Sequence, residues 1–232
     1  VLERDDVKLS AKVVLLPAGS SDDTIFVDYN GERIGMPVLR QQRPGAGGEC
    51  VALSDYICPV GDGGELKDFA GVFAVTSGAV IADCIRRYRD DGDDYKAILM
   101  QTVADRLVEA ATELMHLTVR RTLWGYAVDE DDNEGNRLRQ YYKGIRPAIG
   151  YPSLPDQSLV FVADRIIDYA AMGITLTENG AMSPAASTTG LMLSHPDSRY
   201  FVTGDIDSRQ RDDYMRRRGM SEDDMAKFLP RV

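Results

Sequence analysis

Residues 95–124 read YKAILMQTVADRLVEAATELMHLTVRRTLW, a stretch with the apolar spacing of a long amphipathic helix. Apolar side chains recur there at steps of three and four, which places them on one helical face. The members of this stripe are Leu99, Val103, Leu107, Ala110, Leu114 and Leu117. Asp93 or Asp94 is suited to cap the first turn, because a carboxylate accepts hydrogen bonds from free N–H groups. We predict that this helix forms the backbone of the core.

Short strands and helices surround this helix in irregular order. Runs of β-branched residues predict strands, and capping residues predict further helices. The expected strands are Lys12–Leu16, Thr24–Asp28, Val72–Thr76, Ile174–Thr177, Gly190–Ser194 and Tyr200–Thr203. Further helices are expected over residues 80–89 and 159–170, from Asp207 to just before Gly219, and after Ser221. We predict one α+β domain over residues 1–232 with a twisted antiparallel or mixed sheet.

Three turns are expected between neighbouring strands. Pro17–Asp23 should join the first two strands, and Asn30-Gly31 should close a hairpin directly after them. The segment His195–Ser198 should join the last two strands. These hairpin-like pairs are the reason for expecting antiparallel pairing.

Composition narrows the class of protein. The chain has 232 residues, of which 44% are hydrophobic and 28% charged, which is enough for one large domain or two small ones. The net charge of −10 disfavours nucleic acid or an anionic membrane as a partner. No apolar run approaches the roughly 18 residues that span a bilayer. Three cysteines without zinc-type spacing indicate reduced thiols and a cytoplasmic domain.

The two histidines do not point to catalysis. His116 falls inside the long helix without a second ligand at helical spacing, and we interpret it as structural. Ser194–Ser198 contains His195 and Asp197, which are triad residue types, but triad side chains converge from distant positions. A tight turn explains these adjacent residues better than a catalytic triad does. We expect no catalytic residue and no metal ligand.

The segment Gly144–Pro152 combines an arginine, two prolines, glycines and a tyrosine. Each proline fixes its own φ and restricts the residue before it, which predicts a stiff irregular loop. Arg146 presents a planar fork suited to a carboxylate or phosphate, and Tyr151 presents a ring face and a hydroxyl. The loop is suited to a small zwitterion with an aromatic part. A purely structural Pro/Gly turn explains the same residues equally well.

An ordered set of motifs along nearly the whole chain resembles the activation domain of cobalamin-dependent methionine synthase, which binds S-adenosylmethionine. Each motif is weak alone, and their order carries the resemblance. The matching segments are Leu39–Gln42, Phe73–Thr76, Asp94–Lys96, Ala104–Leu107 with Glu109-Ala110, Trp124–Tyr126, Tyr142–Ala148 with Gly150–Pro152, Leu176–Glu178, Ser194–Ser198 with Tyr200, and Arg218–Ser221.

The resemblance implies a set of ligand-binding residues. Arg146 matches the arginine that pairs with the methionine carboxylate of the ligand, and the loop from Pro147 to Pro152 matches the backbone that receives the adenosine. The residues implied to bind are Arg146, Pro147, Ala148, Gly150, Tyr151, Tyr200, Phe201 and Glu109. Glu109 matches an acid that lines the site. Its position near the apolar stripe is otherwise explained as a surface residue.

Three departures from the family pattern are visible. A second acid of the family is Gln140 here, which removes a negative charge near a cationic sulfonium. A position that is often tyrosine is Phe201, which keeps the ring and loses the hydroxyl. We find no match for the family's N-terminal segment, whose aspartate receives the amino group of the ligand.

The resemblance also implies a function and partners. Such a domain supports the reductive methylation of cob(II)alamin to methylcobalamin in methionine biosynthesis, as part of a methyltransferase and without activity alone. The cobalamin is bound by a neighbouring domain, and the electron comes from flavodoxin or a flavoprotein reductase. Orientation of the methyl donor is the domain's main task, which agrees with the lack of a general base. The alternative is a non-catalytic module that docks on a corrinoid domain with a degenerate S-adenosylmethionine site.

Overall fold

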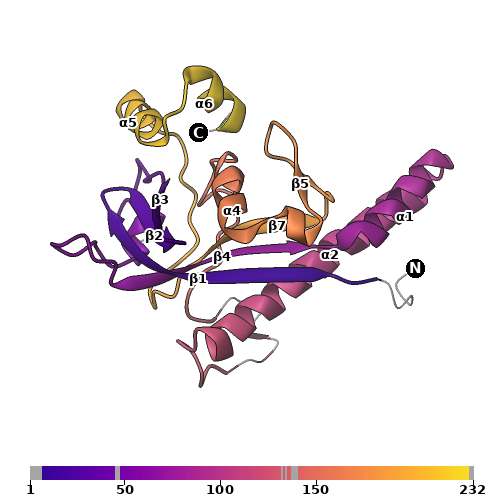
Figure 1. Ribbon diagram of the computed structural model, residues 1–232, viewed down its shortest axis with the longest axis horizontal. Helices are drawn as coiled ribbons and strands as arrows, with labels where there is room; N and C mark the ends of the chain where they lie inside the picture. The colour runs from indigo at the N-terminus through magenta and orange to yellow at the C-terminus, as the bar shows by residue number, and fades with distance from the viewer. Residues whose placement is uncertain (1–6, 45–47, 132, 134, 137–140, 230–232) are drawn as a thin grey trace.

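A five-stranded antiparallel sheet forms the middle layer of the molecule. The computed structural model describes residues 7–44, 48–131, 133, 135, 136 and 141–229. The strands are β1 (Ser10–Ser21), β2 (Thr24–Tyr29), β3 (Glu32–Pro37), β4 (Asp68–Thr76) and β7 (Ser187–Met192). Their order is β3-β2-β1-β4-β7, and every neighbouring pair is antiparallel (Figure 1). Two short strands, β5 (Thr175–Leu176) and β6 (Met182–Ser183), form a separate pair. The predicted α+β class is confirmed.

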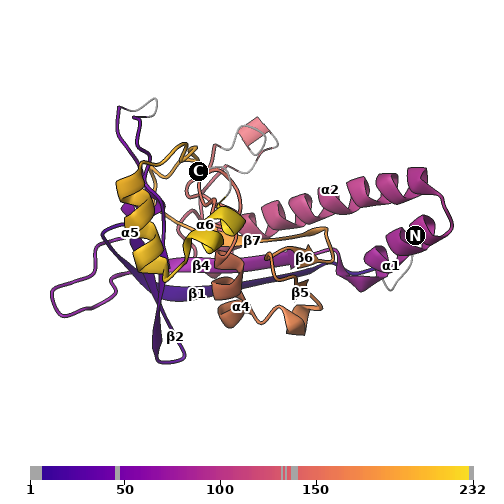
Figure 2. The same cartoon turned by 90° about the horizontal axis from the view of Figure 1, so that it is seen from above.

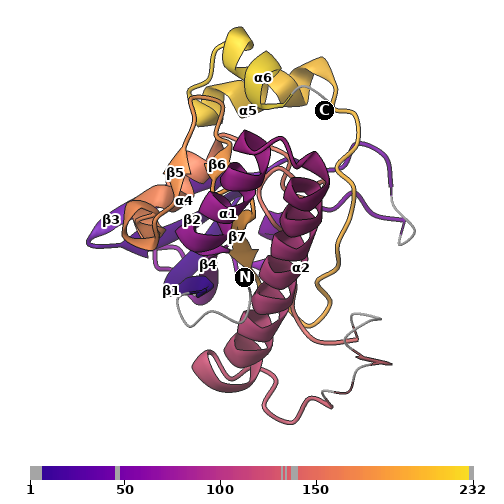
Figure 3. The ribbon, with the colours of Figure 1, turned by 90° about the vertical axis from the view of Figure 1, so that its right-hand side faces the viewer.

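Helices cover both faces of this sheet. They are α1 (Gly78–Asp90), α2 (Asp94–Thr118), α4 (Leu159–Ile167), α5 (Ser208–Arg218) and α6 (Glu222–Phe228). Short helical turns occur at η1 (Leu53–Tyr56), η2 (Val119–Leu123) and η3 (Ala170–Met172). Figure 2 shows α2 along one side of the sheet and α4 on the other. Helices α5 and α6 lie together at one end of the molecule (Figure 3). In the described part of the chain, none of the helices could span a membrane.

Strand β4 shows why the sheet has a helical layer on each side. Phe73 and Val75 belong to the buried cluster that contains residues of α1 and α2. Val72 and Ala74 belong to the cluster that contains residues of α4. Successive side chains of a strand point to opposite faces, so this apolar run packs against both layers.

The long helix is present, but most of the predicted apolar stripe was wrong, although its member Leu107 does pack against the buried cluster. Its buried residues are Ala97, Ala104, Val108, Thr112, Met115 and His116. Leu99 and Leu114 are 51% and 64% exposed, and Ala110 is exposed as well. The small side chains of Ala97 and Ala104 lie on the face that packs inward, where bulk is least tolerated. Packing therefore selected a different face from the one with most leucines.

The N-terminal strands differ from the prediction at one turn and agree with it at another. Strand β1 continues through Pro17 to Ser21, so of the predicted turn Pro17–Asp23 only Asp22 and Asp23 form the turn before β2. Pro17 pairs with Phe69 of β4, while the β1–β2 pairing begins only at Ala18. A residue without an N–H is tolerated there, beyond the end of that ladder. The Asn30-Gly31 hairpin turn is confirmed, with φ values of 50° and 79°.

The C-terminal half of the chain also differs in detail from the elements predicted from the sequence. Helix α4 ends at Ile167 rather than near residue 170, because Asp168 takes a left-handed φ of 59°. The segment Tyr200–Thr203 is not a strand, and β7 begins before Gly190. The caps at Asp207 and Ser221 are confirmed, since their side chains accept hydrogen bonds from Gln210 N and Asp224 N.

The Pro/Gly loop lies along the outer edge of β7. Ile145 and Leu193 exchange two backbone hydrogen bonds of 2.9 Å, and Leu191 N donates to Pro147 O at 3.0 Å. The loop approaches Gly190 most closely, where an added Cβ would lie 2.2 Å from Pro147 O. Glycine is required there by contact rather than by φ. This close approach positions the loop relative to the sheet.

A buried polar group lies where α2 passes into the π-helical turn η2. His116 is fully buried, and its Nδ1 lies 2.9 Å from Nη1 of Arg120. Because arginine only donates, Nδ1 accepts and the imidazole is neutral. Burial, followed by the charges of Arg120 and Arg146, lowers the pKa of His116 from 6.5 to about 2. The interpretation of His116 as structural agrees with this environment.

The neutral state of His116 predicts a pH dependence of stability. Between pH 6.5 and pH 2 the unfolded chain binds a proton that the folded chain does not, so stability falls as the solution is acidified. From pH 7 to about pH 5.5 this costs about 1.2 kcal/mol. Urea unfolding at both pH values should show that His116→Asn loses less stability than the wild type by this amount. An equal loss in both proteins would contradict the assignment.

Gly190→Ala should destabilise the fold, because the new methyl group meets backbone atoms that cannot rotate away. We expect a loss of about 1–3 kcal/mol in urea unfolding. Gly63→Ala is the matched control, since its Cβ would meet nothing within 4 Å. Equal stability of the two variants would show that the loop does not depend on this contact.

Candidate functional site

A cavity of about 430 Å³ opens between α2, the Pro/Gly loop and the segment 200–202. Its walls combine carboxylate, guanidinium, aromatic and proline side chains. The lining residues are Glu109, Arg146, Pro147, Ala148, Tyr151, Pro152, Ser153, Thr188, Tyr200, Phe201 and Val202. The cavity is therefore suited to a ligand that carries both charge and an apolar surface.

The structure brings the predicted site residues together, with one exception. All of them line this cavity except Gly150, which lines an adjacent hollow of about 580 Å³. The two hollows share Tyr151, Pro152 and Val202. Gly150 has a φ of 84°, and an added Cβ would lie 2.3 Å from Oε1 of Gln157. Gln140 lies outside the described residues.

Arg146 is the charged centre of the cavity wall. Its Nη2 donates to Glu109 Oε1 at 2.9 Å and to Glu113 Oε2 at 2.8 Å. Only 13% of its side chain is exposed. Burial alone would lower the pKa of Arg146, but hydrogen bonds to Glu113 and Glu109 outweigh burial and raise it. The guanidinium therefore remains charged. Its Nε is buried and has no hydrogen-bond partner among the described residues.

Glu113 is the residue that sequence reasoning missed. It follows Glu109 by four positions on α2, so both carboxylates reach the same side of the helix. This spacing was visible in the sequence, but no pattern there indicated that both would meet Arg146. The cation that they share is Arg146, which reaches them only once the loop has folded.

Tyr200 supports the loop through its hydroxyl group. The hydroxyl accepts a hydrogen bond of 3.0 Å from Arg146 N. Burial raises the pKa of Tyr200, although the hydrogen bond from Arg146 opposes this shift. The phenol is therefore neutral near pH 7 and keeps a proton that it can donate to a ligand.

The segment 200–203 is anchored from two directions. Ser153 Oγ donates to Phe201 O at 2.7 Å, and Thr203 N donates to Pro152 O at 3.0 Å. From the other side, Gln41 Nε2 donates to Val202 O at 2.9 Å. This wall is thus fixed both to the loop and to the segment that follows β3.

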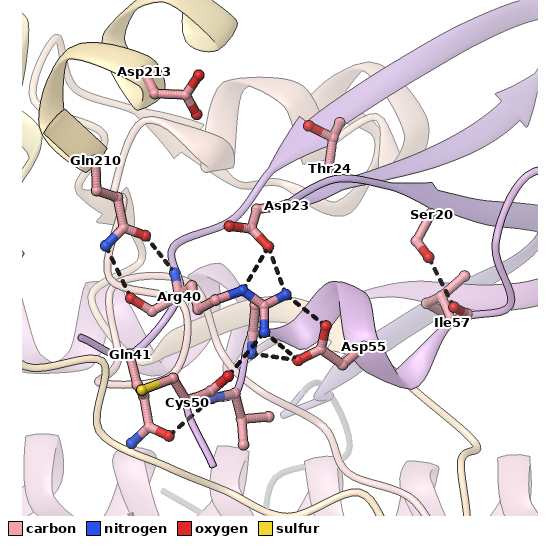
Figure 4. A network of polar contacts seen from close by, with 12 residues as sticks. Ser20, Asp23, Thr24, Arg40, Gln41, Cys50, Asp55, Ile57, Gln210 and Asp213 are labelled. Carbon is pink, nitrogen blue, oxygen red and sulfur yellow. Dashed lines mark hydrogen bonds and ion pairs between the residues drawn. The ribbon is translucent and has the colours of Figure 1, made fainter. Parts of the chain in front are cut away.

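The neighbouring Arg40 belongs to a separate structural network (Figure 4). Its guanidinium binds Asp23 and Asp55 at 2.6 Å each, and Gln210 of α5 bonds to both its backbone N and O. The motif Leu39–Gln42 therefore ties α5 to the sheet and supports the cavity wall from behind.

Among the described residues, the cavity has no arrangement typical of a nucleophile with its base. No group of three or more His, Cys, Asp or Glu side chains there is placed to hold a metal ion. His195 forms a turn with Asp197, whose N lies 3.2 Å from its Nδ1, and its ring packs near Tyr56. The charged and aromatic groups that line the cavity are suited to bind and orient an ionic ligand.

Comparison with known proteins agrees with this geometry. A family model described as the activation domain of vitamin B12-dependent methionine synthase matches residues 1–219. The chain is also similar to a solved structure, the crystal structure of the MetH reactivation domain bound to AdoHcy. The two share 34% identity, with a TM-score of 0.88, over 97% of this chain and 70% of that one. This chain belongs to the family of methionine synthase activation domains.

Proposed function

We propose that the cavity around Arg146 binds S-adenosylmethionine and that the chain serves the reactivation of cobalamin in a methionine synthase. The observation that carries this proposal is Arg146, a partly buried guanidinium in the wall of a cavity that is also lined by Glu109 and the rings of Tyr151 and Tyr200. The similar MetH domain was solved with AdoHcy, which differs from S-adenosylmethionine by one methyl group. A site built for one therefore fits the other.

The charges of the cavity complement those of the ligand. S-adenosylmethionine carries a carboxylate, an ammonium and a sulfonium group. Arg146 is suited to the carboxylate, because a guanidinium presents parallel donors to two oxygens. Glu109, which is 61% exposed, supplies a negative charge for the cationic part. Pro147, Ala148, Gly150 and Tyr151 supply backbone groups and a ring for the adenosine, and Tyr200 and Phe201 close the opposite wall.

The protein's contribution to the reaction is orientation. The methyl group of the ligand is already activated by the sulfonium, so no general base is needed. Cobalamin, held by a neighbouring domain, would supply a reduced cobalt nucleophile for this methyl group, and S-adenosylhomocysteine would leave as the carbon–sulfur bond breaks. The residues of this chain hold the ligand in one pose and direct its methyl group outward, and such positioning accounts for a large part of a rate enhancement.

The partners follow from this role. They are the cobalamin-binding domain of the synthase and an electron donor, flavodoxin or a flavoprotein reductase. The methyltransferase activity belongs to the whole synthase, with this domain inactive alone. A cytoplasmic location is supported by the three cysteines, which are all free thiols. The alternative function, a docking module without ligand binding, is motivated by Gln140 and Phe201 and predicts corrinoid-domain binding that is independent of S-adenosylmethionine.

Arg146→Ala should weaken the binding of S-adenosylmethionine. Loss of a charged hydrogen bond at a desolvated site costs about 1.5–3 kcal/mol, which is roughly tenfold or more in dissociation constant. Calorimetric titration of both proteins measures this change. Arg165→Ala is the control, because Arg165 pairs with Glu32 on the surface and does not line the cavity.

Equal affinity of Arg146→Ala and the wild type would remove Arg146 from the carboxylate site. Absence of binding by the wild type, together with capture of a corrinoid domain, would favour the docking alternative. Thermal unfolding of each variant shows whether lost binding reflects lost structure.

A further inference from the structure

Glu113 lies between Arg120, which is buried, and Arg146, which is partly buried, and it lines neither of the two hollows described above. Its Oε2 accepts a hydrogen bond of 2.8 Å from Arg146 Nη2, and its Oε1 lies 3.9 Å from Arg120 Nη1. The Arg120 and Arg146 side chains are only 1% and 13% exposed. One carboxylate therefore faces two guanidinium groups in a region with little water to screen them.

Arg120 is itself fixed on several sides. Its Nε donates to Glu130 at 2.8 Å, its Nη1 lies 2.9 Å from His116, and its guanidinium carbon lies 4.1 Å from the centre of the Tyr142 ring. The other oxygen of Glu130 accepts from Lys143 N at 2.8 Å. Arg146, Glu113, Arg120 and Glu130 thus form an alternating chain of charges, which we call the arginine–glutamate chain. It links α2 and η2 to Glu130, Lys143 and Arg146.

The two carboxylates on Arg146 differ in their surroundings. Glu109 is 61% exposed and lines the cavity, whereas Glu113 is 24% exposed and is not among the lining residues. Both hydrogens of Arg146 Nη2 are used, one by each carboxylate. Either bidentate edge of a guanidinium includes Nη2, so a ligand carboxylate needs one of these hydrogens to be released. The exposed Glu109 is the one free to move.

We infer that Glu113 is a positioning residue, which fixes the guanidinium of Arg146 for the ligand carboxylate. Glu109 releases its hydrogen bond from Arg146 Nη2 when the ligand binds. This inference rests on the proposed function of the cavity. The charge of Arg120, 3.9 Å behind Glu113, favours its present position, and Glu113 stays in place when the ligand enters. Its contribution is to keep the donor edge of Arg146 directed toward the cavity before binding, which reduces the cost of ordering it.

The test compares two ligands that differ only in the carboxylate. Wild type, Glu113→Gln and Glu113→Ala are titrated calorimetrically with S-adenosylmethionine and with decarboxylated S-adenosylmethionine. We expect Glu113→Ala to weaken S-adenosylmethionine binding roughly tenfold, with a smaller loss for Glu113→Gln, which keeps an acceptor. The decarboxylated ligand should change by about twofold or less, as for an exposed ion pair. Glu32→Ala is the matched control, because it breaks a surface pair with Arg165.

Three results would overturn the inference. Equal weakening of both ligands would show that Glu113 acts through the fold or its charge alone. Tighter binding of S-adenosylmethionine by Glu113→Gln would show that Glu113 competes with the ligand. Unchanged binding of both ligands would show that Arg146 needs no support from it.

A second readout separates this inference from the proposed function. The Nε–H signal of Arg146 in nitrogen-15 NMR is assigned by its loss in Arg146→Ala. We expect a sharp, slowly exchanging signal in the wild type, because Nε is buried, and a broadened one in Glu113→Ala. If the wild type binds neither ligand, the proposed function fails and this signal alone decides whether Glu113 positions Arg146. An unchanged signal would overturn the inference.

Discussion

The contact between Gly190 and the backbone of Pro147 and Ala148 is the constraint on which the site depends. Strand β7 is the last strand of the sheet, and an unprotected edge of this kind invites pairing with other chains. The Pro/Gly loop covers this edge with four backbone hydrogen bonds. The same pairing fixes Arg146 between α2 and Tyr200, so one contact completes the sheet and builds the cavity.

The charges behind the loop, of which Arg120 is buried and the other three are partly buried, carry a cost in free energy. Burying an ion pair costs desolvation that its attraction only partly offsets, so such pairs are weak evidence for stability. Here the arginine–glutamate chain alternates in sign, and each member has an opposite charge as a neighbour. Two of its buried atoms, Glu113 Oε1 and Arg146 Nε, have no hydrogen-bond partner in the part of the chain that the structure describes. A structure that only needed stability would bury apolar groups there, and the retained charges agree with a site organised in advance for an ionic ligand.

The sequence predicted the elements better than their faces. The long helix, the Asn30-Gly31 turn and the caps at Asp207 and Ser221 follow from local rules, and each was confirmed. The buried face of α2 did not follow, because the tight packing of Ala97 and Ala104 decides it and leucine spacing does not. The extension of β1 through Pro17 was missed because it depends on the neighbouring strands. Strand β4 still pairs with β1 at Pro17, whereas the pairing with β2 begins only at Ala18.

The site, too, was predicted in part and missed where tertiary contacts decide. The family resemblance predicted a site that includes Arg146, Tyr151, Tyr200 and Glu109. All four line one cavity in the folded chain. Their binding roles remain predictions. Glu113 was not foreseen, because its meaning comes from two arginines that are 7 and 33 positions away along the chain. Charges that meet only after folding leave no local pattern to read.

A crystal structure of this chain with S-adenosylmethionine would show directly whether Arg146 binds the ligand carboxylate. We expect the ligand carboxylate on the guanidinium of Arg146, with Glu113 unmoved and Glu109 turned away from Nη2. The adenosine should lie against the backbone of Pro147–Tyr151. A ligand whose carboxylate binds elsewhere, or which occupies a different hollow while Arg146 keeps both glutamates, would contradict it.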